Sequence, residues 1–478
     1  MKRKLYVTTS IPYVNAEPHV GYALELIQAD VIARYGRLTG RAVRFQTGTD
    51  ENALKNVLAA EQEGITTQEL VDRNAGRFAA LVQALCISAD DFVRTTETRH
   101  RRGVHAFWQA LQPENVVQRD YIGLYCTGCE DFYLPRDLVD GKCPEHDRPP
   151  VEVAERNYFF ALPRHERWLA ERLERGELDV IPSSRRNEVL SFVRGGLTEF
   201  SISRPAARMK GWGTPVPGDD SQTVYVWVDA LINYVSALGF GCGDRWREWW
   251  NDDVEKVHVI GKNVWKFHAV YWPALLRSAG LPLPDKLVVH GFLTVNGRKI
   301  GKSLGNAVDP FSVIGKYGTD AVRYYLLRAV PPFGDGDFSV SRLEELYRTE
   351  LANGIGNLVS RLASLCAKVG YDSPRRPPSA TPPKCLANAV GAFAFDKALA
   401  GLFGIVTDVN KDIERHRPWE LLKAEKTDEL RPLLARWLAE VWHLAVWLEP
   451  FLPTTSAGIV ERLFSGPVRA ASPLFPRL

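Results

Sequence analysis

The stretch from residue 5 to residue 60 alternates between strand and helix patterns, and this restricts the fold more than any other feature of the sequence. Residues 5–9 form a short apolar run that is typical of a strand, and residues 43–45 alternate between apolar and charged side chains as a second strand. Between them apolar residues recur at helical spacing up to a stop signal at Gly40, and they are Val20, Leu24, Ile27, Val31 and Tyr35. A strand, helix, strand order predicts a parallel sheet, which binds ligands at the carboxyl ends of its strands.

The same α/β pattern returns in the second half of the chain. Residues 224–228, 257–260 and 286–289 are short apolar runs of the kind found in buried strands. Beyond about residue 345 the pattern becomes helical. One-sided apolar positions indicate two helices there, at Leu351, Ile355, Leu358 and Leu362 and at Trp437, Val441 and Ala445. The proline-rich residues 372–384 predict a solvated loop inside this helical region.

Residues 115–220 interrupt the α/β pattern with short strands, turns and a cluster of cysteines, which predicts an insertion. We therefore expect an α/β domain in two halves, followed by a smaller module and a helical domain. The expected boundaries are 1–114 for the first half, 115–220 for the insertion, 221–292 for the second half, 293–345 for the module and 346–478 for the helical domain.

Composition and charge exclude several classes of protein. Apolar residues make up 45% and charged residues 24%, and no apolar stretch approaches the roughly 20 residues that cross a bilayer. The net charge is only +3, from 60 basic and 57 acidic residues, so any nucleic-acid surface must be local. Seven cysteines and an N-terminus that runs into a strand instead of a signal peptide predict a reducing cytoplasm, where clustered cysteines usually hold metal. We also expect a monomer, because no further module follows the helical region.

A histidine, His19, stands where the first helix pattern begins, two residues before Gly21. A glycine at this point lets a nucleotide approach the backbone, and a helix N-terminus favours phosphate. The His19 ring would then donate a hydrogen bond to phosphate oxygens. Histidine at a helix start is also common as a surface or capping group, so this feature alone identifies no site.

Two lysines, Lys299 and Lys302, bracket Gly301 and are followed by Ser303. Such a pair on a loop can clamp the pyrophosphate of ATP while charge shifts at the α-phosphorus. The ending Gly-Lys-Ser also suggests a P-loop, but that motif needs a glycine at position 296, which is Asn296. A plain basic surface loop remains the alternative.

Four potential metal ligands, Cys126, Cys129, Cys143 and His146, are arranged as two pairs with two residues inside each pair. This spacing is typical of a closed tetrahedral zinc knuckle. The alternative, four cysteine and histidine residues without a shared role, explains the spacing much less well. A complete ligand set leaves no open position. The Zn²⁺ would therefore fold the insertion and take no part in chemistry.

In this order, the three motifs resemble those of the methionyl-tRNA synthetases, which are class I aminoacyl-tRNA synthetases. His-Val-Gly-Tyr at 19–22 is similar to the HIGH motif, Lys-Ile-Gly-Lys-Ser at 299–303 to the KMSKS motif, and the cysteine cluster to the family's zinc knuckle. Further segments resemble the family at comparable separations, namely 47–51, 226–230, 260–262, 267–268, 272–273, 290–292, 356–357 and 418–420. The resemblance implies a Rossmann-type parallel-sheet catalytic domain with a zinc-bearing insertion, followed by an all-α anticodon-binding bundle.

The family's activity is a methionine–tRNA ligase reaction in two steps. The carboxylate of L-methionine attacks the α-phosphorus of ATP, used with Mg²⁺, and the methionyl group then passes from the adenylate to the terminal ribose of tRNA(Met). The resemblance implies that Asp50 pairs with the α-ammonium group. It implies a methionine pocket formed by Ile11, Tyr13, Trp227, Ala230, Leu231, Tyr234, Val264, His268 and Trp272. A thioether prefers such an apolar, polarizable wall, although aromatic residues such as Trp227 and Trp272 also commonly fill cores.

The resemblance also assigns residues to ATP and to tRNA. The catalytic residues it implies are His19, Gly21, Tyr22, Lys299, Lys302 and Ser303. Gly291 and Phe292 would frame the adenine, and Glu51 or Asn263 would bind the ribose. Asn357, Arg361 and Trp419 match positions that read the anticodon, where unpaired bases are bound by stacking and hydrogen bonds.

Several residues around the ATP site depart from the family pattern. They are Tyr22 for the last histidine of HIGH, Asn52 and Ala53 for His-Gly, Asn263 for an acidic residue, and Ile300 and Gly301 for Met and Ser of KMSKS. Because the other sets of residues are kept, we expect an active but divergent enzyme, such as a second copy that resists an inhibitor. The alternatives are a paralog of secondary metabolism, which activates another amino acid or passes the aminoacyl group to a small acceptor, and a non-catalytic tRNA-binding protein.

Overall fold

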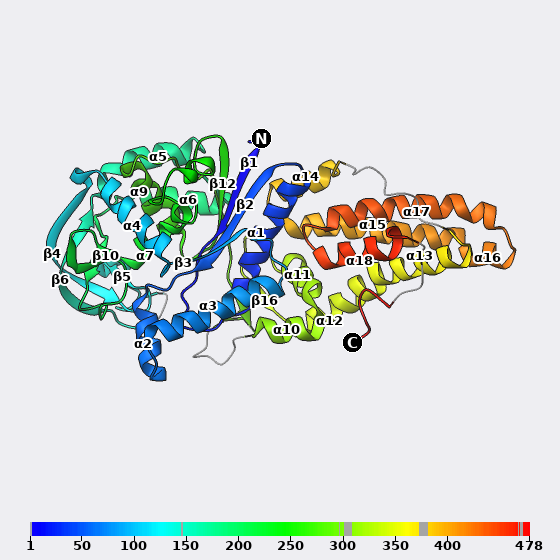
Figure 1. The fold of residues 1–478 in the computed structure, drawn as a ribbon, viewed down its shortest axis with the longest axis horizontal. Helices are drawn as coiled ribbons and strands as arrows, with labels where there is room; N and C mark the ends of the chain where they lie inside the picture. Colours follow the sequence, from blue (N-terminus) through cyan, green and yellow to red (C-terminus); the bar gives the residue numbers. More distant parts are fainter. Residues whose placement is uncertain are drawn as a thin grey trace. The chain divides into compact units, whose positions relative to one another are not determined.

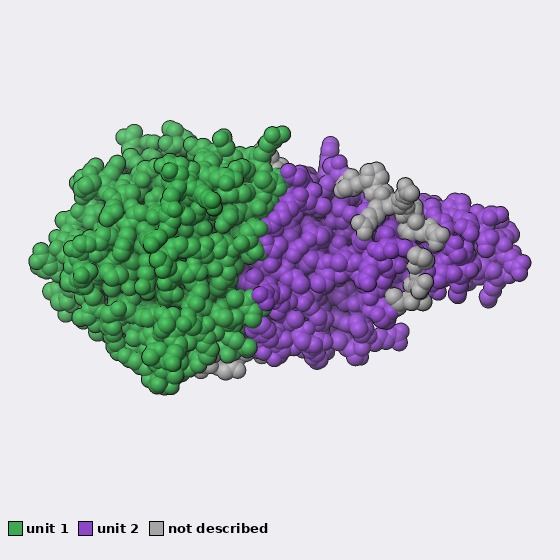
Figure 2. Space-filling view, viewed as in Figure 1, with its two compact units in different colours: residues 1–18, 41–80, 89–289 green, residues 19–40, 81–88, 290–478 purple. Residues whose placement is uncertain are grey.

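The chain forms two compact units, each assembled from segments that are distant in the sequence (Figure 2). The computed structural model describes residues 2–144, 147–295, 297–300, 308–371, 381–466, 468 and 472–478. Unit 1 comprises residues 1–18, 41–80 and 89–289, and unit 2 comprises residues 19–40, 81–88 and 290–478.

Unit 1 is built on a six-stranded sheet in the order β3-β2-β1-β12-β13-β7 (Figure 1). Its strands are β1 (Lys4–Thr9), β2 (Ala42–Thr49), β3 (Asp91–Arg94), β7 (Asp179–Ile181), β12 (Val254–Gly261) and β13 (Lys286–His290). The pairs β1–β2, β1–β12, β2–β3 and β7–β13 are all parallel. Adjacent residues of β1 such as Tyr6 and Val7 are both fully buried, because both faces of the sheet are covered. The predicted parallel sheet, with strands at 5–9, 43–45, 257–260 and 286–289, is thus confirmed.

The strand predicted at 224–228 is wrong. Strand β11 (Asp219–Val224) ends where this run begins, and the short helix α7 (Val226–Leu231) follows. Val226, Val228 and Leu231 are each at most 3% exposed, so α7 is surrounded by protein. A short apolar segment that is buried on all sides carries no periodicity to distinguish helix from strand.

Helices surround the sheet of unit 1, and an antiparallel insertion extends from it (Figure 1). The other helices are α2 (Leu54–Glu63), α3 (Thr67–Ala84), α4 (Thr98–Ala110), α5 (Glu166–Glu174), α6 (Ser183–Arg194), α8 (Asn233–Ser236), the π-helix η5 (Phe267–Tyr271) and α9 (Trp272–Ser278). Short 3-10 turns occupy Pro113–Asn115, Pro135–Asp137, Leu162–His165 and Arg245–Glu248.

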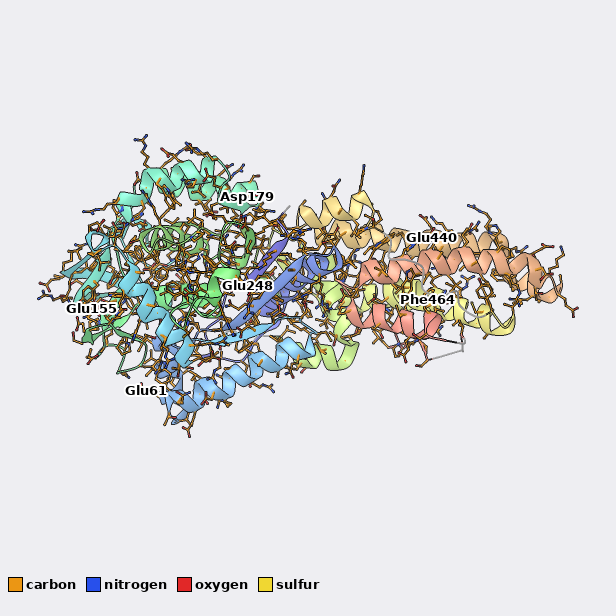
Figure 3. All side chains as sticks on the ribbon, turned by 45° about the horizontal axis from the view of Figure 1, so that its top comes forward. Glu61, Glu155, Asp179, Glu248, Glu440 and Phe464 are labelled. Atoms are coloured by element: carbon orange, nitrogen blue, oxygen red, sulfur yellow. The ribbon has the colours of Figure 1, made fainter. Side chains whose placement is uncertain are left out.

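The insertion contains one sheet in the order β5-β4-β6-β8 and another in the order β10-β11-β9. The strands are β4 (Val116–Cys126), β5 (Asp131–Tyr133), β6 (Val151–Phe160), β8 (Phe200–Ser201), β9 (Ser203–Pro205) and β10 (Pro215–Val216). Glu155, labelled on β6 in Figure 3, forms an ion pair with Arg208. This pair links the long β4–β6 hairpin to the segment that returns to the main sheet.

Unit 2 combines a long buried helix, a small sheet and a helical bundle (Figure 1). Its first part contains α1 (Val20–Leu38), β14 (Leu293–Val295), β15 (Arg298–Lys299), α10 (Pro310–Tyr317), α11 (Thr319–Arg328) and β16 (Gly336–Phe338). The bundle contains α12 (Val340–Leu346), the π-helix η7 (Tyr347–Gly356), α13 (Asn357–Lys368), α14 (Lys384–Gly391), α15 (Phe395–His416), α16 (Pro418–Lys423), α17 (Thr427–Leu448) and α18 (Pro453–Phe464).

The two apolar helix faces predicted in the bundle are confirmed, because all seven of their residues are at most 1% exposed.

Residues 372–380 of the predicted proline-rich loop lie outside the described residues. No helix in the described part of the chain has both the length and the apolar character that a membrane span requires.

Arg323 on α11 holds together parts of unit 2 that are far apart in the sequence. It is fully buried, and its guanidinium lies 2.8 Å from the carboxylate of Asp30 on α1. The same group donates to the carbonyl oxygens of Leu85, Pro450 and Phe451 at 2.7–3.1 Å. A buried charge is tolerated only when its donors are satisfied in this way. This arginine therefore fixes α1, and the residues at its N-terminus, against the rest of the unit.

Candidate functional site

In unit 1 the candidate site residues gather at the carboxyl ends of neighbouring parallel strands. Tyr13 follows β1 and Asp50 follows β2, and the two residues form an isolated parallel bridge. The Asp50 N–H donates to the carbonyl oxygen of Pro12 at 2.9 Å. Asn263 lies in the turn after β12 and is exposed. This edge of an open parallel sheet is where a ligand is expected.

Aromatic side chains from several elements meet beside this edge, either within one buried apolar cluster or packed against it. Trp227 on α7 stacks on Phe267 with ring centroids 3.9 Å apart and planes within 6°. Tyr13 contacts Trp227 edge-on at 5.9 Å. Tyr234 packs against Trp272 at 6.0 Å. The arrangement offers an apolar, polarizable wall for a ligand side chain.

The hydrogen bonds of His268 fix the orientation of Tyr234. The His268 Nδ1 atom lies 2.9 Å from the carbonyl oxygen of Val264, which can only accept, so Nδ1 carries the proton. Burial lowers the pKa of His268 to about 4, so the ring is neutral near pH 7 and Nε2 is an acceptor. The Tyr234 hydroxyl therefore donates to Nε2, at 2.7 Å. The pocket wall thus has one defined pattern of donors and acceptors.

Asp50 is a buried carboxylate surrounded by other acidic groups. It is 1% exposed, and burial, followed by the charges of Asp229 and Glu130, raises the pKa of its carboxyl well above the usual range. Its nearby donor is the backbone N–H of Asn52, at 3.2 Å. A buried carboxylate in such surroundings is stabilised by a cation, and the α-ammonium group of an amino acid is one.

Asn52 connects Asp50 to Asp229. Its side-chain amide donates to Asp229 Oδ2 at 2.9 Å, and the same oxygen lies 3.2 Å from His100 Nε2. Sequence reasoning missed Asp229, His100 and Phe267 as parts of this site. A charged residue inside the apolar run at 226–231 was a usable signal for Asp229, whereas no local pattern indicates His100.

The structure also places the two residues predicted to bind ribose. Glu51 is fully buried, and its carboxylate accepts two hydrogen bonds from Arg94, at 2.6 and 3.0 Å, and one from Thr49 at 2.8 Å. Asn263 is exposed.

Of the remaining residues predicted to form the methionine pocket, Ile11 is half-buried. The others are between 0 and 8% exposed, namely Ala230, Leu231, Val264 and Trp272.

Three of the four predicted metal ligands form a cluster in the insertion. The Sγ atoms of Cys126, Cys129 and Cys143 all lie within 4.8 Å of one another, and Cys129 and Cys143 are 3.5 Å apart. Sulfur atoms in a tetrahedron with Zn–S bonds of about 2.3 Å are separated by roughly 3.8 Å. The cluster therefore has the donors and the size that Zn²⁺ requires. His146 lies outside the described residues.

In unit 2, His19 is the N-cap of α1. Its Nδ1 atom accepts a hydrogen bond from the Gly21 N–H at 3.0 Å. A Cβ at residue 21 would lie 2.8 Å from the His19 ring, so Gly21 makes room for this ring. Burial lowers the pKa of His19, and the neutral ring then carries its proton on Nε2. The capping role and a donor role are therefore compatible. Tyr22, in the first turn, is 8% exposed.

The described residues on either side of the lysine motif belong to unit 2. Lys299 ends β15, which pairs with β14 through a turn at Gly297, whose φ is +69°. Gly301, Lys302 and Ser303 lie outside the described residues. After them, the carbonyl oxygen of Val308 accepts from the N–H of Val20 at 3.3 Å. Val308 is thus hydrogen-bonded to the first turn of the helix that His19 caps.

Gly291 and Phe292 belong to unit 2 and come directly after β13 in the sequence. A Cβ at Gly291 would lie 2.1 Å from the carbonyl oxygen of Gly334, so no side chain fits at this position. The N–H of Phe292 donates to Asp335 at 2.8 Å. The close approach of these two backbone segments leaves Phe292 half-buried.

The three predicted anticodon residues lie on the bundle of unit 2. Asn357 and Arg361 are one turn apart on α13, and Asn357 is exposed. The guanidinium of Arg361 lies 5.7 Å from the ring centroid of Trp419 and 2.8 Å from a carboxylate oxygen of Glu414. Trp419 is 37% exposed, which is unusual for so large an apolar ring. An exposed ring beside a positioned cation is suited to stacking on an unpaired base.

Comparisons with known proteins agree with this geometry. The family described as "tRNA synthetases class I (M)" matches residues 5–152 and 146–363. The methionine–tRNA ligase of Thermotoga maritima is 40% identical over 96% of this chain and 75% of its own length. That of Brucella suis is 38% identical over 97% of this chain and 92% of its own length. The chain belongs to the methionyl-tRNA synthetase family.

Solved methionyl-tRNA synthetases also match the fold along the whole chain. The Mycobacterium tuberculosis methionyl-tRNA synthetase in complex with methionyl-adenylate superposes with a TM-score of 0.89, at 35% identity, over 100% of both chains. The free form of that synthetase superposes with a TM-score of 0.82 at 32% identity. The predicted class I synthetase fold, with a parallel sheet and a helical C-terminal region, is confirmed.

Proposed function

We propose that this methionyl-tRNA synthetase homologue is a methionine–tRNA ligase, which activates L-methionine with ATP and transfers it to tRNA(Met). The observation that carries this proposal is the meeting of a buried carboxylate, Asp50, with a wall of aromatic side chains at the carboxyl ends of parallel strands. A free α-ammonium group pairs with the carboxylate. A thioether side chain packs against polarizable rings.

In the proposed complex, Trp227, Tyr13, Tyr234 and His268 surround the methionine side chain. The stacked Trp227–Phe267 pair and the Tyr234–His268 hydrogen bond support this assignment, because both hold the rings in fixed positions. The other residues that we assign to the pocket are Ile11, Ala230, Leu231, Val264 and Trp272.

For the ATP site, we assign the phosphates to the helix start at His19 and to the two lysines, Lys299 and Lys302. The Nε2–H of His19 is the donor that its capping bond leaves available in the neutral ring. The lysines would balance the charge that develops on pyrophosphate, with Mg²⁺ on the ATP. Gly291 and Phe292 would frame the adenine. Asn263 is better suited than Glu51 to bind ribose, since the Glu51 carboxylate is already committed to Arg94.

We assign the cysteine cluster to one structural Zn²⁺, held by Cys126, Cys129, Cys143 and His146. When bound, the metal supplies folding energy to the insertion and no chemistry. The three clustered sulfur atoms support this assignment. Because such ligands must stay reduced, we also propose a cytoplasmic location for the protein.

We propose five parts for the chain, with boundaries after residues 114, 220, 292 and 345.

Pyrophosphate exchange with a panel of amino acids tests the proposed function. We expect ATP–pyrophosphate exchange that depends on methionine, because activation is reversible before transfer. Exchange with a different amino acid would indicate the paralog of secondary metabolism, and no exchange at all would indicate a non-catalytic tRNA-binding protein. Exchange with methionine but without charging of initiator or elongator tRNA would point to a small-molecule acceptor.

Replacing Trp419 with Ala should weaken charging of tRNA(Met) and leave methionine-dependent exchange unchanged. Loss of one stacked base costs about 1–3 kcal/mol, so kcat/KM for tRNA should fall roughly 5- to 160-fold. Trp419→Phe keeps a stacking ring and should restore most of the activity. Equal losses in charging and exchange would show that Trp419 acts by supporting the fold instead.

A further inference from the structure

Three consecutive residues that begin at the second ligand of the cysteine cluster each contact a different part of the candidate methionine pocket. The carbonyl oxygen of Cys129 accepts a hydrogen bond from Trp227 Nε1 at 3.2 Å. The carboxylate of Glu130 accepts from the backbone N–H of Lys55 at 3.0 Å. The carboxylate of Asp131 lies 2.8 Å from Lys266 Nζ. All of these residues belong to unit 1.

Two of these contacts bear on the stacked Trp227–Phe267 pair of the pocket. Trp227 is itself a wall of the pocket, and it stacks on Phe267. Lys266 immediately precedes Phe267, and its ammonium group lies 5.5 Å from the centroid of that ring. The two partners of the stack are therefore both attached to residues 129–131.

The Glu130 contact supports the segment that carries Asp50. Helix α2 begins at Leu54, and its N-cap, Ala53, has no side chain that can cap the helix. Glu130 supplies the missing acceptor in the first turn, where a carboxylate is favoured by the helix dipole. Only residues 51–53 separate this capped turn from Asp50.

The backbone conformation of residues 129–131 depends on its surroundings. Glu130 has a φ of +55°, in the left-handed region that costs a residue other than glycine about 1–3 kcal/mol. The Cys129 side chain, one residue earlier, is anchored in the cysteine cluster. A metal ion at the cluster would hold Cys129 and so maintain the conformation that all three contacts require.

We infer that metal binding at the cysteine cluster and amino-acid binding in the pocket are energetically coupled through residues 129–131. This inference rests on the proposed function. Because coupling between two sites is reciprocal, methionine must then increase the affinity for the metal by the same factor by which the metal increases the affinity for methionine. The segment is a positioning element and does not touch the reacting atoms.

The test measures metal release and methionine binding separately. The full chain is loaded with Zn²⁺, and the amount of Zn²⁺ released to a chromogenic chelator at equilibrium is measured with and without saturating methionine. We expect methionine to raise the affinity for Zn²⁺ about 10-fold, within the usual range of coupling between sites. Calorimetry should show a similar loss of methionine affinity after Zn²⁺ is removed.

Two variants locate the coupling. Asp131→Asn removes the ion pair with Lys266 and should reduce the effect of methionine on Zn²⁺ release severalfold while Zn²⁺ still binds. Lys142→Ala is the matched control, because Lys142 lies beside Cys143 and, among the described residues, its side chain forms an ion pair with the exposed Asp147. Its coupling should equal that of the unaltered chain.

The possible failures are distinct. If methionine binds but does not change Zn²⁺ release from the unaltered chain, the inference is wrong and the proposed function stands. If the chain binds no methionine, the proposed function itself fails. If the chain takes up no Zn²⁺, the metal assignment and the coupling are both overturned.

Discussion

Replacing Asp50 with Asn is expected to lower kcat/KM for methionine-dependent pyrophosphate exchange by about 10²- to 10³-fold. The substitution removes the negative partner of the substrate ammonium in a site that excludes water, and such a loss costs about 3–4 kcal/mol. Asp50 is 1% exposed, so solvent cannot replace the missing charge. Steady-state exchange over a range of methionine concentrations measures the effect.

The stability of the Asp50→Asn variant distinguishes a binding role from a structural one. The pKa of Asp50 is raised in the folded chain, so its ionised form opposes folding once the pH exceeds the ordinary carboxyl range. Stability is therefore lost as the pH rises toward the raised pKa, and Asn avoids this loss. At neutral pH the variant should have a Tm equal to or above that of the unaltered chain. A lower Tm together with lost exchange would assign Asp50 to the fold. Asp253→Asn, at an exposed position, is the control.

Replacing Lys302 with Ala should reduce the rate of adenylate formation by about 10²- to 10³-fold while methionine affinity stays nearly constant. In the proposed site this lysine acts on charge that develops only as pyrophosphate leaves, and losing such an interaction affects the transition state alone. Single-turnover adenylate formation measures the first quantity, and calorimetry with methionine alone measures the second.

Lys316→Ala is the matched control for Lys302→Ala. Lys316 is an exposed lysine of α10 in the same unit, and it pairs with Glu344. Its removal should leave adenylate formation unchanged. If Lys302→Ala behaved like this control, the motif at 299–303 would be a plain basic surface loop. If it weakened methionine binding to the same extent as adenylate formation, a role confined to the transition state would be excluded.

Two departures from the expected family pattern, Asn52 and Tyr22, look less disruptive in the structure than they do in the sequence. Asn52, at a position where the resemblance leads us to expect histidine, donates to Asp50 through its backbone N–H and to Asp229 through its side-chain amide. Tyr22 is mostly buried in the first turn of α1, and it leaves the capping bond of His19 intact. Both substitutions are therefore integrated into the local packing.

The sequence by itself determined the features that depend on neighbours along the chain. The continuous apolar runs at 5–9 and 257–260 predict buried strands, and the helical spacing of Leu351 and Ile355 predicts the inner face of a helix, because burial selects which positions of an element are apolar. The spacing of Cys126 and Cys129 likewise predicts the cysteine cluster, since one turn brings both sulfur atoms together.

Only the tertiary structure decided which distant groups meet. The segment 226–231 is a helix in the structure, although an apolar composition that is buried on all sides also suits a strand. The pairing of Asp229 with His100, the ion pair of Arg323 with Asp30, and the contact between Trp227 and Cys129 join residues with no common pattern in the sequence. Such contacts are selected by the packing of whole elements and by the need to satisfy buried polar groups, and neither requirement leaves a periodic trace in the chain.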